Sequence, residues 1–289
     1  MTATAGRPVD QPDAVMAKAA GENFPVAPLL LPRAVRRHLL AIYGFARLVD
    51  ELGDEAPGDR LAQLDAIDRD LDRIYRRAGG AATAAPEHPL LVEVAATIRA
   101  FDIPPEPFRR LIQANRQDQV VSRYQRYEDL LAYCELSANP VGHLVLYVFG
   151  SATPERLKLS DRICTGLQLV EHWQDVAEDL ARDRIYLPQE DLARFGVDQG
   201  DLAAPRAGER VRRLMEFEVA RTAELFDRGA PLIGTLRGRA RLAVAGFLAG
   251  GRAALAAIVD SGYDVLSVSP KPTRRRLARE LSSILLGKG

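Results

Sequence analysis

Apolar residues recur along most of the chain at intervals of three and four positions, the spacing that gathers side chains on one face of an α-helix. The apolar stretch 144–149 comes nearest to a strand, but it continues a helical segment. A break is expected at Asn139-Pro140, because proline interrupts helical hydrogen bonding. The pattern predicts helices over 34–52, 59–77, 89–101, 105–120, 128–149, 159–182, 206–228, 237–259 and 273–286.

Helices of these lengths bury their apolar stripes against one another, so we predict an all-α, single-domain helical bundle. Two stretches, 77–89 and 194–208, are rich in Gly, Ala, Pro and polar residues and are predicted to be surface loops within that domain. The domain is expected to span residues 1–289, with residues 1–21 flexible and a C-terminal helix within 270–289.

Composition narrows the classes of function. The chain has 289 residues, of which 47% are hydrophobic, and its 39 basic and 39 acidic residues give a formal net charge of zero. This balance argues against a general affinity for nucleic acid. The two cysteines, Cys134 and Cys164, lack CxxC spacing and suggest a reduced compartment. The N-terminus has no apolar core of a signal peptide, so we predict a cytoplasmic location.

A long apolar run at residues 242–259 raises the question of a membrane. Arg252 interrupts it, and its many Gly and Ala residues favour a helix packed closely against neighbours. Peripheral contact with the inner face of a membrane remains an alternative. The run of Arg274, Arg275 and Arg276 is interpreted as a solvated face, or as a contact for anionic lipid.

The first candidate site lies in the segment YGFARLVDELGDE, at the end of the helix predicted over 34–52. Asp50 and Asp54 are four residues apart and share a helix face, with Tyr43 and Arg47 on the preceding turns. Alone, such a cluster is more often a solvated helix end.

The second candidate site is a polar stripe formed by Gln168, Glu171, Asp175, Asp179 and Arg182, with spacings of three, four, four and three. Carboxylates four apart on a helix repel each other, so either the stripe is solvated or a positive charge belongs there. Magnesium prefers oxygen ligands and commonly uses one or two carboxylates with phosphate oxygens and water.

The presence of two acidic stripes in one chain favours a binding site over two solvated helix faces. Carboxylates on two opposed helices can hold divalent cations that neutralise a diphosphate and help it to leave. Arg47, Arg182 and Arg184 could bind its oxygens. The implied reaction is ionisation of an allylic or cyclopropylcarbinyl diphosphate in an apolar pocket, where aromatic rings stabilise the cation.

Other catalytic motifs are absent from the sequence: it has no Walker A sequence, no HExxH, no GxGxxG after a strand, and no signature of a serine or cysteine nucleophile. His172 adjoins Glu171, but neighbouring helical residues face different directions. We therefore interpret His172 as structural, and Cys134 as a small buried hydrophobic residue.

In order along residues 22–266, these segments resemble the motifs of the squalene/phytoene synthase family. The resemblance implies a class I isoprenoid synthase fold with a central active-site cavity. It implies catalytic roles for Tyr43, Asp50, Asp54, Tyr133, Asp175 and Asp179. It implies substrate contacts from Phe24, Arg47, Asp118, Val141, Gly142, Gln168, Arg184, Tyr186 and Tyr263. The metal ligands that it implies are Asp50, Asp54, Glu171, Asp175 and Asp179.

Within the family, the segments ENFPVAPLLLP and YCELSANPVG are similar to the hydroxysqualene synthase branch of hopanoid pathways. That resemblance implies conversion of presqualene diphosphate and water to hydroxysqualene and diphosphate, with three magnesium ions and without NADPH. The alternatives are a presqualene diphosphate, dehydrosqualene or phytoene-type synthase that condenses two prenyl diphosphates, and a non-catalytic helical assembly protein of the same fold. The sequence leaves the oligomeric state open.

Two residues depart from the family pattern. Many members have asparagine where this chain has Glu171, which keeps an oxygen ligand and adds a charge. Other branches place a tyrosine where Gly251 falls, which weakens the phytoene-type alternative and is expected to leave more room in the cavity.

Overall fold

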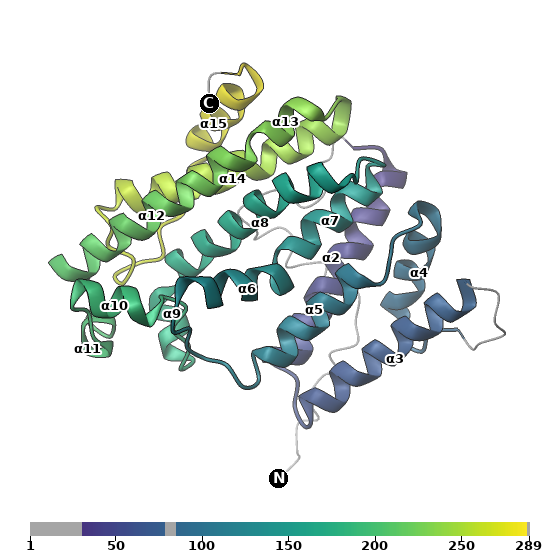
Figure 1. Cartoon of the computed structure of the whole chain (residues 1–289), viewed down its shortest axis with the longest axis horizontal. Coiled ribbons are helices and arrows are strands. Elements are labelled where there is room, and N and C mark those ends of the chain that lie inside the picture. The colour runs from purple at the N-terminus through teal and green to yellow at the C-terminus, as the bar shows by residue number, and fades with distance from the viewer. Residues whose placement is uncertain (1–30, 79–84, 288–289) are drawn as a thin grey trace, which may run out of the picture.

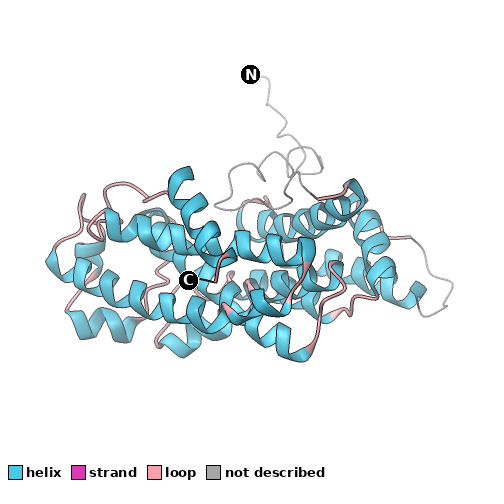
Figure 2. Ribbon diagram, turned by 90° about the horizontal axis from the view of Figure 1, so that it is seen from above, coloured by secondary structure: helices cyan, strands magenta, loops and turns pink. Residues whose placement is uncertain are grey.

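The computed structural model describes residues 31–78 and 85–287, and over these ranges the chain folds into helices joined by loops (Figures 1 and 2). The predicted all-α class is confirmed. Phe24 and the segment 1–21 lie outside the described residues. The helices are α2 (Arg33–Asp54), α3 (Arg60–Ala78), α4 (Pro89–Phe101), α5 (Glu106–Gln117), α6 (Tyr127–Ser137), α7 (Asn139–Val148), α8 (Pro154–Gln174), α9 (Val176–Ala181), α10 (Gln189–Phe195), α11 (Gln199–Leu202), α12 (Glu209–Gly229), α13 (Pro231–Thr235), α14 (Gly238–Asp260) and α15 (Arg274–Leu285).

The core has two parts that meet along α7 and α8 (Figure 1). One part joins α2, α3, α4, α5 and α7, where the buried rings of Phe45 and Phe108 meet edge to face with centroids 5.0 Å apart. The other part joins α6, α8, α12 and α14 around Trp173, whose indole N–H donates to Thr222 Oγ1 at 2.9 Å. The candidate site lies between these two parts.

Two predicted boundaries were wrong. The helix predicted over 159–182 is two helices, because Asp175 leaves the helical conformation at φ −105°, ψ 17°. At this break the Asp175 carboxylate and the Gln174 amide contact Ser269 and Pro270, in the loop after α14. The loop predicted over 194–208 contains α11, which Asp198 caps by accepting a hydrogen bond from the Asp201 backbone N–H. The break at Asn139 is confirmed.

Helix α14 has the length and hydropathy of a membrane span, but 67% of its most apolar stretch is buried inside the protein. It packs as a core helix, as its small residues predicted. A Cβ at Gly251 would collide with the Phe226 ring and crowd Leu167. The space beside Gly251 is therefore filled by these two side chains, and the absence of a tyrosine there does not enlarge the cavity.

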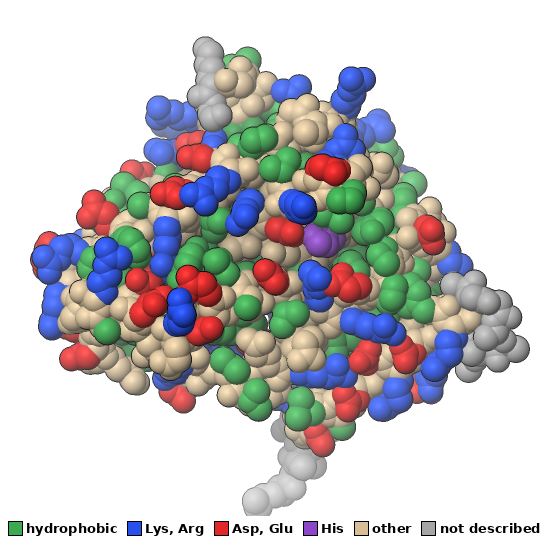
Figure 3. Space-filling model, in the orientation of Figure 1, with side chains coloured by type: hydrophobic (Ala, Val, Ile, Leu, Met, Phe, Trp, Pro, Cys, Tyr) green, Lys and Arg blue, Asp and Glu red, His purple; other side chains and the backbone are tan. Residues whose placement is uncertain are grey.

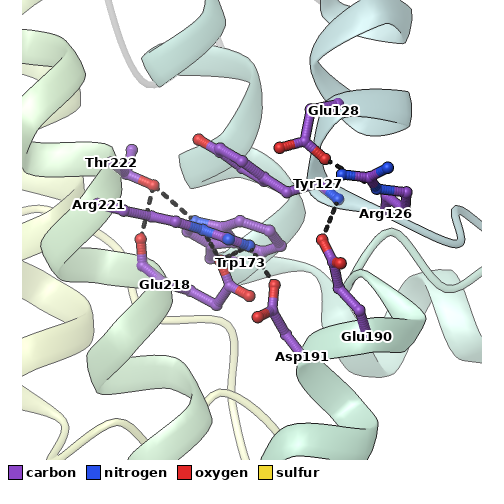
Figure 4. A network of polar contacts seen from close by, with 9 residues as sticks. All are labelled: Arg126, Tyr127, Glu128, Trp173, Glu190, Asp191, Glu218, Arg221 and Thr222. Carbon is purple, nitrogen blue, oxygen red and sulfur yellow. Dashed lines mark hydrogen bonds and ion pairs between the residues drawn. The ribbon is translucent and has the colours of Figure 1, made fainter.

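A buried polar network ties α6, α8, α10 and α12 together (Figure 4). The Arg221 guanidinium pairs with Asp191 at 2.7 Å and with Glu218 at 2.6 Å, and it lies 3.5 Å above the centre of the Tyr127 ring. The network anchors α10, which directly follows the segment that carries Arg184 and Tyr186.

The surface carries both signs of charge. Acidic and basic side chains are interspersed over the face seen in Figure 3, as expected from the zero net charge. Such a surface does not favour binding to a polyanion.

Candidate active site

A cavity of about 230 Å³ lies where α2, α5, α7, α8 and α14 meet. Its wall is largely apolar and includes Ile42, Leu111, Val145, Leu167 and Phe247. The structure brings predicted residues from both acidic segments to this cavity, namely Tyr43, Arg47, Asp50, Gln168 and Glu171, together with Val141 of α7. The polar residues from α2 and α8 thus share one cavity with an apolar wall, which is the arrangement that two helical stripes predicted.

The α2 side of the cavity can receive an anion. Arg47 Nη1 lies 3.9 Å from Asp50 Oδ2, and the Arg47 side chain is about a quarter exposed. Arg47 Nε is buried and has no hydrogen-bond partner among the described residues. Buried guanidinium donors are normally satisfied, so this N–H suits an acceptor such as a phosphate oxygen.

The two acidic segments meet at Asp54 and Arg184. Arg184 Nη2 donates to Asp54 Oδ1 at 2.8 Å. The segment carrying Arg184 is held by the Ile185 backbone N–H, which donates to Ser122 O at 3.0 Å. The loop after α5 therefore positions Arg184 opposite the end of α2.

Asp118 and Tyr133 form a second polar pair. Tyr133 Oη donates to Asp118 Oδ2 at 2.9 Å, while Asp118 Oδ1 is buried without a partner among the described residues. Burial raises the pKa of Asp118 to about 7, against the lowering effects of the Tyr133 hydrogen bond and the Arg184 charge. A carboxylate in this position would be stabilised by a nearby cation.

Aromatic rings surround this pair. The His172 and Tyr186 rings stack with centroids 3.7 Å apart, and Tyr133 lies 5.9 Å from Tyr186 and 5.5 Å from Tyr124. Ring faces carry negative electrostatic potential and can stabilise a carbocation. Tyr133 and Tyr186 thus lie beside this polar pair, and neither ring lines the main cavity.

His172, interpreted from the sequence as structural, lies among the predicted site residues. Its Nε2 lies 3.2 Å from Gln168 Nε2, and its Nδ1 lies 3.9 Å from Asp179 Oδ2. Burial and the Arg184 charge lower its pKa to about 3, so the ring is neutral. His172 follows Gln168 by one helical turn and precedes Asp179 by two, which accounts for these contacts.

The two aspartates of the second acidic stripe have different surroundings. Asp179 lies near His172, Arg184 and Tyr186, and burial together with the Asp175 charge raises its pKa to about 7. Asp175 Oδ1 instead accepts a hydrogen bond from Ser269 Oγ at 3.2 Å, and burial raises its pKa. Asp175 does not line the main cavity.

These carboxylates suit magnesium only together with a ligand. Among residues 31–78 and 85–287, no group of three or more His, Cys, Asp or Glu side chains is close enough to hold an ion alone. Magnesium often binds through one or two carboxylates, with phosphates and water completing its shell. The buried, partnerless Asp118 Oδ1 and the raised pKa of Asp179 fit such cations. The donor set fits ions shared with a diphosphate.

Two further predicted residues lie elsewhere. Gly142 packs against α8, where a Cβ would collide with Ser160 Oγ and Cys164 Sγ, so it sets a close helix approach. Tyr263 has a positive φ of 62° in the turn after α14 and is absent from the lining of the main cavity.

Comparison with known proteins identifies relatives along most of the chain. Residues 17–277 match the model of the squalene/phytoene synthase family. A 15-cis-phytoene synthase of Synechococcus elongatus is 32% identical over 271 residues, which are 89% of this chain and 86% of the relative. A hydroxysqualene synthase of Rhodopseudomonas palustris is 31% identical over 217 residues, which are 75% of this chain and 72% of the relative.

Solved structures agree in fold. The squalene synthase HpnC of Alicyclobacillus acidocaldarius is 42% identical and superposes with a TM-score of 0.78, covering 87% of this chain and 94% of that one. A dehydrosqualene synthase in complex with a ligand is 22% identical, with a TM-score of 0.84 over 96% of this chain and 95% of that one. The second likeness concerns the fold alone.

Proposed function

Because the chain belongs to the squalene/phytoene synthase family, we propose that it is a magnesium-dependent synthase that ionises presqualene diphosphate and adds water to give hydroxysqualene. The observation that carries this proposal is the Arg184–Asp54 contact, which joins both acidic segments beside an apolar cavity. The 42% identity to the squalene synthase HpnC and the 31% identity to a hydroxysqualene synthase support the choice of branch.

In this reaction Arg47 and Arg184 bind the diphosphate oxygens, and Arg47 Nε supplies a donor. Bound magnesium ions, held through Asp50, Asp54, Glu171, Asp175 and Asp179, would supply the positive charge that makes the diphosphate a good leaving group. The C–O bond breaks with its electron pair on the diphosphate. Water then bonds to the carbocation and loses a proton.

The apolar wall of the cavity keeps bulk water from the carbocation. The rings of Tyr133 and Tyr186 lie beside Asp118 rather than in this wall, and they would stabilise positive charge that develops there. Tyr43 lines the same cavity, where its ring can contact the substrate. No reductant takes part, because the product retains the oxygen of water.

A second candidate function is condensation of two prenyl diphosphates to presqualene diphosphate, dehydrosqualene or phytoene. The 15-cis-phytoene synthase match, which covers 89% of the chain, favours this alternative. It uses the same diphosphate chemistry, with a second prenyl chain in place of water.

Product analysis decides between these functions. The purified protein is incubated separately with presqualene, farnesyl and geranylgeranyl diphosphate, with and without magnesium and NADPH. We expect hydroxysqualene from presqualene diphosphate and magnesium alone. Condensed products from the shorter diphosphates, with presqualene diphosphate left unchanged, would instead support the second function. If none of the three diphosphates is converted, the result would support a non-catalytic assembly role.

We also propose that the protein works in the cytoplasm and meets its apolar substrate at the membrane surface. Helix α14 is mostly buried, so such contact would be peripheral. Arg276 pairs with Glu280 at 3.1 Å, whereas Arg274 and Arg275 are exposed on α15, where they can face anionic lipid.

A further inference from the structure

Asn115 lies on α5 directly behind the first acidic segment. Its residue surface is 5% exposed, and its Nδ2 donates to Asp50 Oδ1 and to the backbone oxygen of Leu111, each at 3.2 Å. The second bond ties the amide to its own helix, which restricts its rotamer. The first bond reaches across to a predicted metal ligand.

The end of α2 is shaped to accept this amide. A Cβ at Gly53 would overlap Asn115 Oδ1, so only glycine leaves room for the side chain as it stands. Just after the end of α5, Gln119 Nε2 donates to Gly53 O and to Asn115 O, each at 2.9 Å. Two buried or half-buried amides therefore hold the last turn of α2 against α5.

The chemistry of an amide suits this task. A neutral N–H donor orients a carboxylate but leaves its negative charge available, whereas an arginine would neutralise much of it. Asp50 Oδ2 points toward Arg47, at 3.9 Å from Nη1. The two oxygens of Asp50 thus have different neighbours, and the Asn115 hydrogen bond fixes the rotation of the carboxylate between α5 and Arg47.

We propose that Asn115 is a positioning residue that aims the Asp50 carboxylate into the cavity and thereby sets the affinity of the site for magnesium with diphosphate. This inference rests on the proposed function of the site. Gly53 and Gln119 act with it, by making room for the amide and by fixing the helix end that carries Asp50.

The test measures binding of inorganic pyrophosphate by calorimetry at a series of magnesium concentrations, alongside thermal unfolding without magnesium. In Asn115→Leu, which keeps the side-chain size and removes the donor, we expect the magnesium requirement to rise about tenfold, the usual effect of losing a hydrogen bond to a charged group. Gln113→Leu, at an exposed position of the same helix, is the matched control and should bind as the wild type does.

Two further variants keep the test decisive if Asn115→Leu is unstable. Asn115→Asp preserves the shape but sets a carboxylate against Asp50, so the magnesium requirement should change more than in Asn115→Leu. Gly53→Ala should lower both the unfolding temperature and the magnesium affinity. Adding Asn115→Ala to Gly53→Ala should restore the unfolding temperature, because the overlap is gone, but not the affinity.

The two possible failures can be told apart. If the wild type binds pyrophosphate with magnesium and Asn115→Leu has the same magnesium requirement as Gln113→Leu, the positioning role is wrong and the proposed function stands. If the wild type binds no pyrophosphate at any magnesium concentration, the proposed function fails, and the positioning role fails with it.

Discussion

Arg184 donates to Asp54 across 130 positions of sequence, with its Nη2 2.8 Å from Asp54 Oδ1. The two side chains are 18% and 39% exposed, so the pair lies at the edge of the site rather than in its core. An ion pair of this exposure contributes little to stability. In the proposed function, its position between the two acidic segments places it to hold the diphosphate.

Replacing Arg184 with lysine should separate binding from folding. Lysine keeps the charge but loses the planar fork that binds a phosphate through two donors. We expect kcat/KM to fall by about tenfold to a hundredfold, with the unfolding temperature nearly unchanged. Steady-state kinetics and thermal unfolding check both, with Arg213→Lys, on the exposed face of α12, as the control. A variant with wild-type kinetics would exclude Arg184 from the diphosphate site.

Removing a predicted metal ligand should abolish activity without unfolding the protein. We expect Asp50→Ala and Asp175→Ala each to lower turnover by more than about a hundredfold, with circular dichroism unchanged. Asp175 contacts Ser269, so Ser269→Ala is a useful comparison: it removes that hydrogen bond and leaves the carboxylate in place. Wild-type turnover in either aspartate variant would overturn its metal assignment.

Glu171 offers a sharper test of the metal site, because asparagine is common at this position in the family. Glu171→Asn keeps an oxygen in the cavity and removes a charge. If Glu171 binds magnesium, the magnesium concentration for half-maximal activity should rise severalfold. Stability should change little, since one i,i+4 carboxylate repulsion is worth about 0.2–0.5 kcal/mol. Glu135→Gln, exposed on α6, is the control, and an unchanged magnesium dependence would show that Glu171 is not a working ligand.

Local patterns predicted the helical class and part of the cavity lining, whereas Asp54, Asp175 and Asp179 do not line the cavity. Tyr43, Arg47 and Asp50 repeat along one face of α2, and that periodicity alone brings them to a common wall. The family of the chain followed from the order of such segments.

Distant contacts were not predictable in the same way. The helix break at Asp175 coincides with a hydrogen bond from Ser269, which lies 94 positions away, and nothing in the residues around Asp175 forbids a continuous helix. The pairing of Asn115 with Gly53 likewise depends on how α5 packs against α2.

The network behind the site predicts how stability depends on pH. Glu218 is fully buried and shares Arg221 with Asp191, so two carboxylates face one guanidinium. Burial raises the pKa of Glu218 to about 8; Arg221 opposes this shift and Asp191 adds to it. In the unfolded chain the pKa is the ordinary 4.5. Between these values the unfolded state has released the proton of Glu218 and the folded state has kept it.

The free energy of unfolding should therefore fall as pH rises from about 4.5 to about 8, because the folded state binds more protons in this range. Glu218→Gln preserves the shape and cannot ionise, so its stability should lack this part of the decline. Urea unfolding at pH 5, 6, 7 and 8 measures the difference between the variant and the wild type. Glu224→Gln, on an exposed part of the same helix, should follow the wild type. Parallel curves for Glu218→Gln and the wild type would show that Glu218 ionises normally in the folded protein.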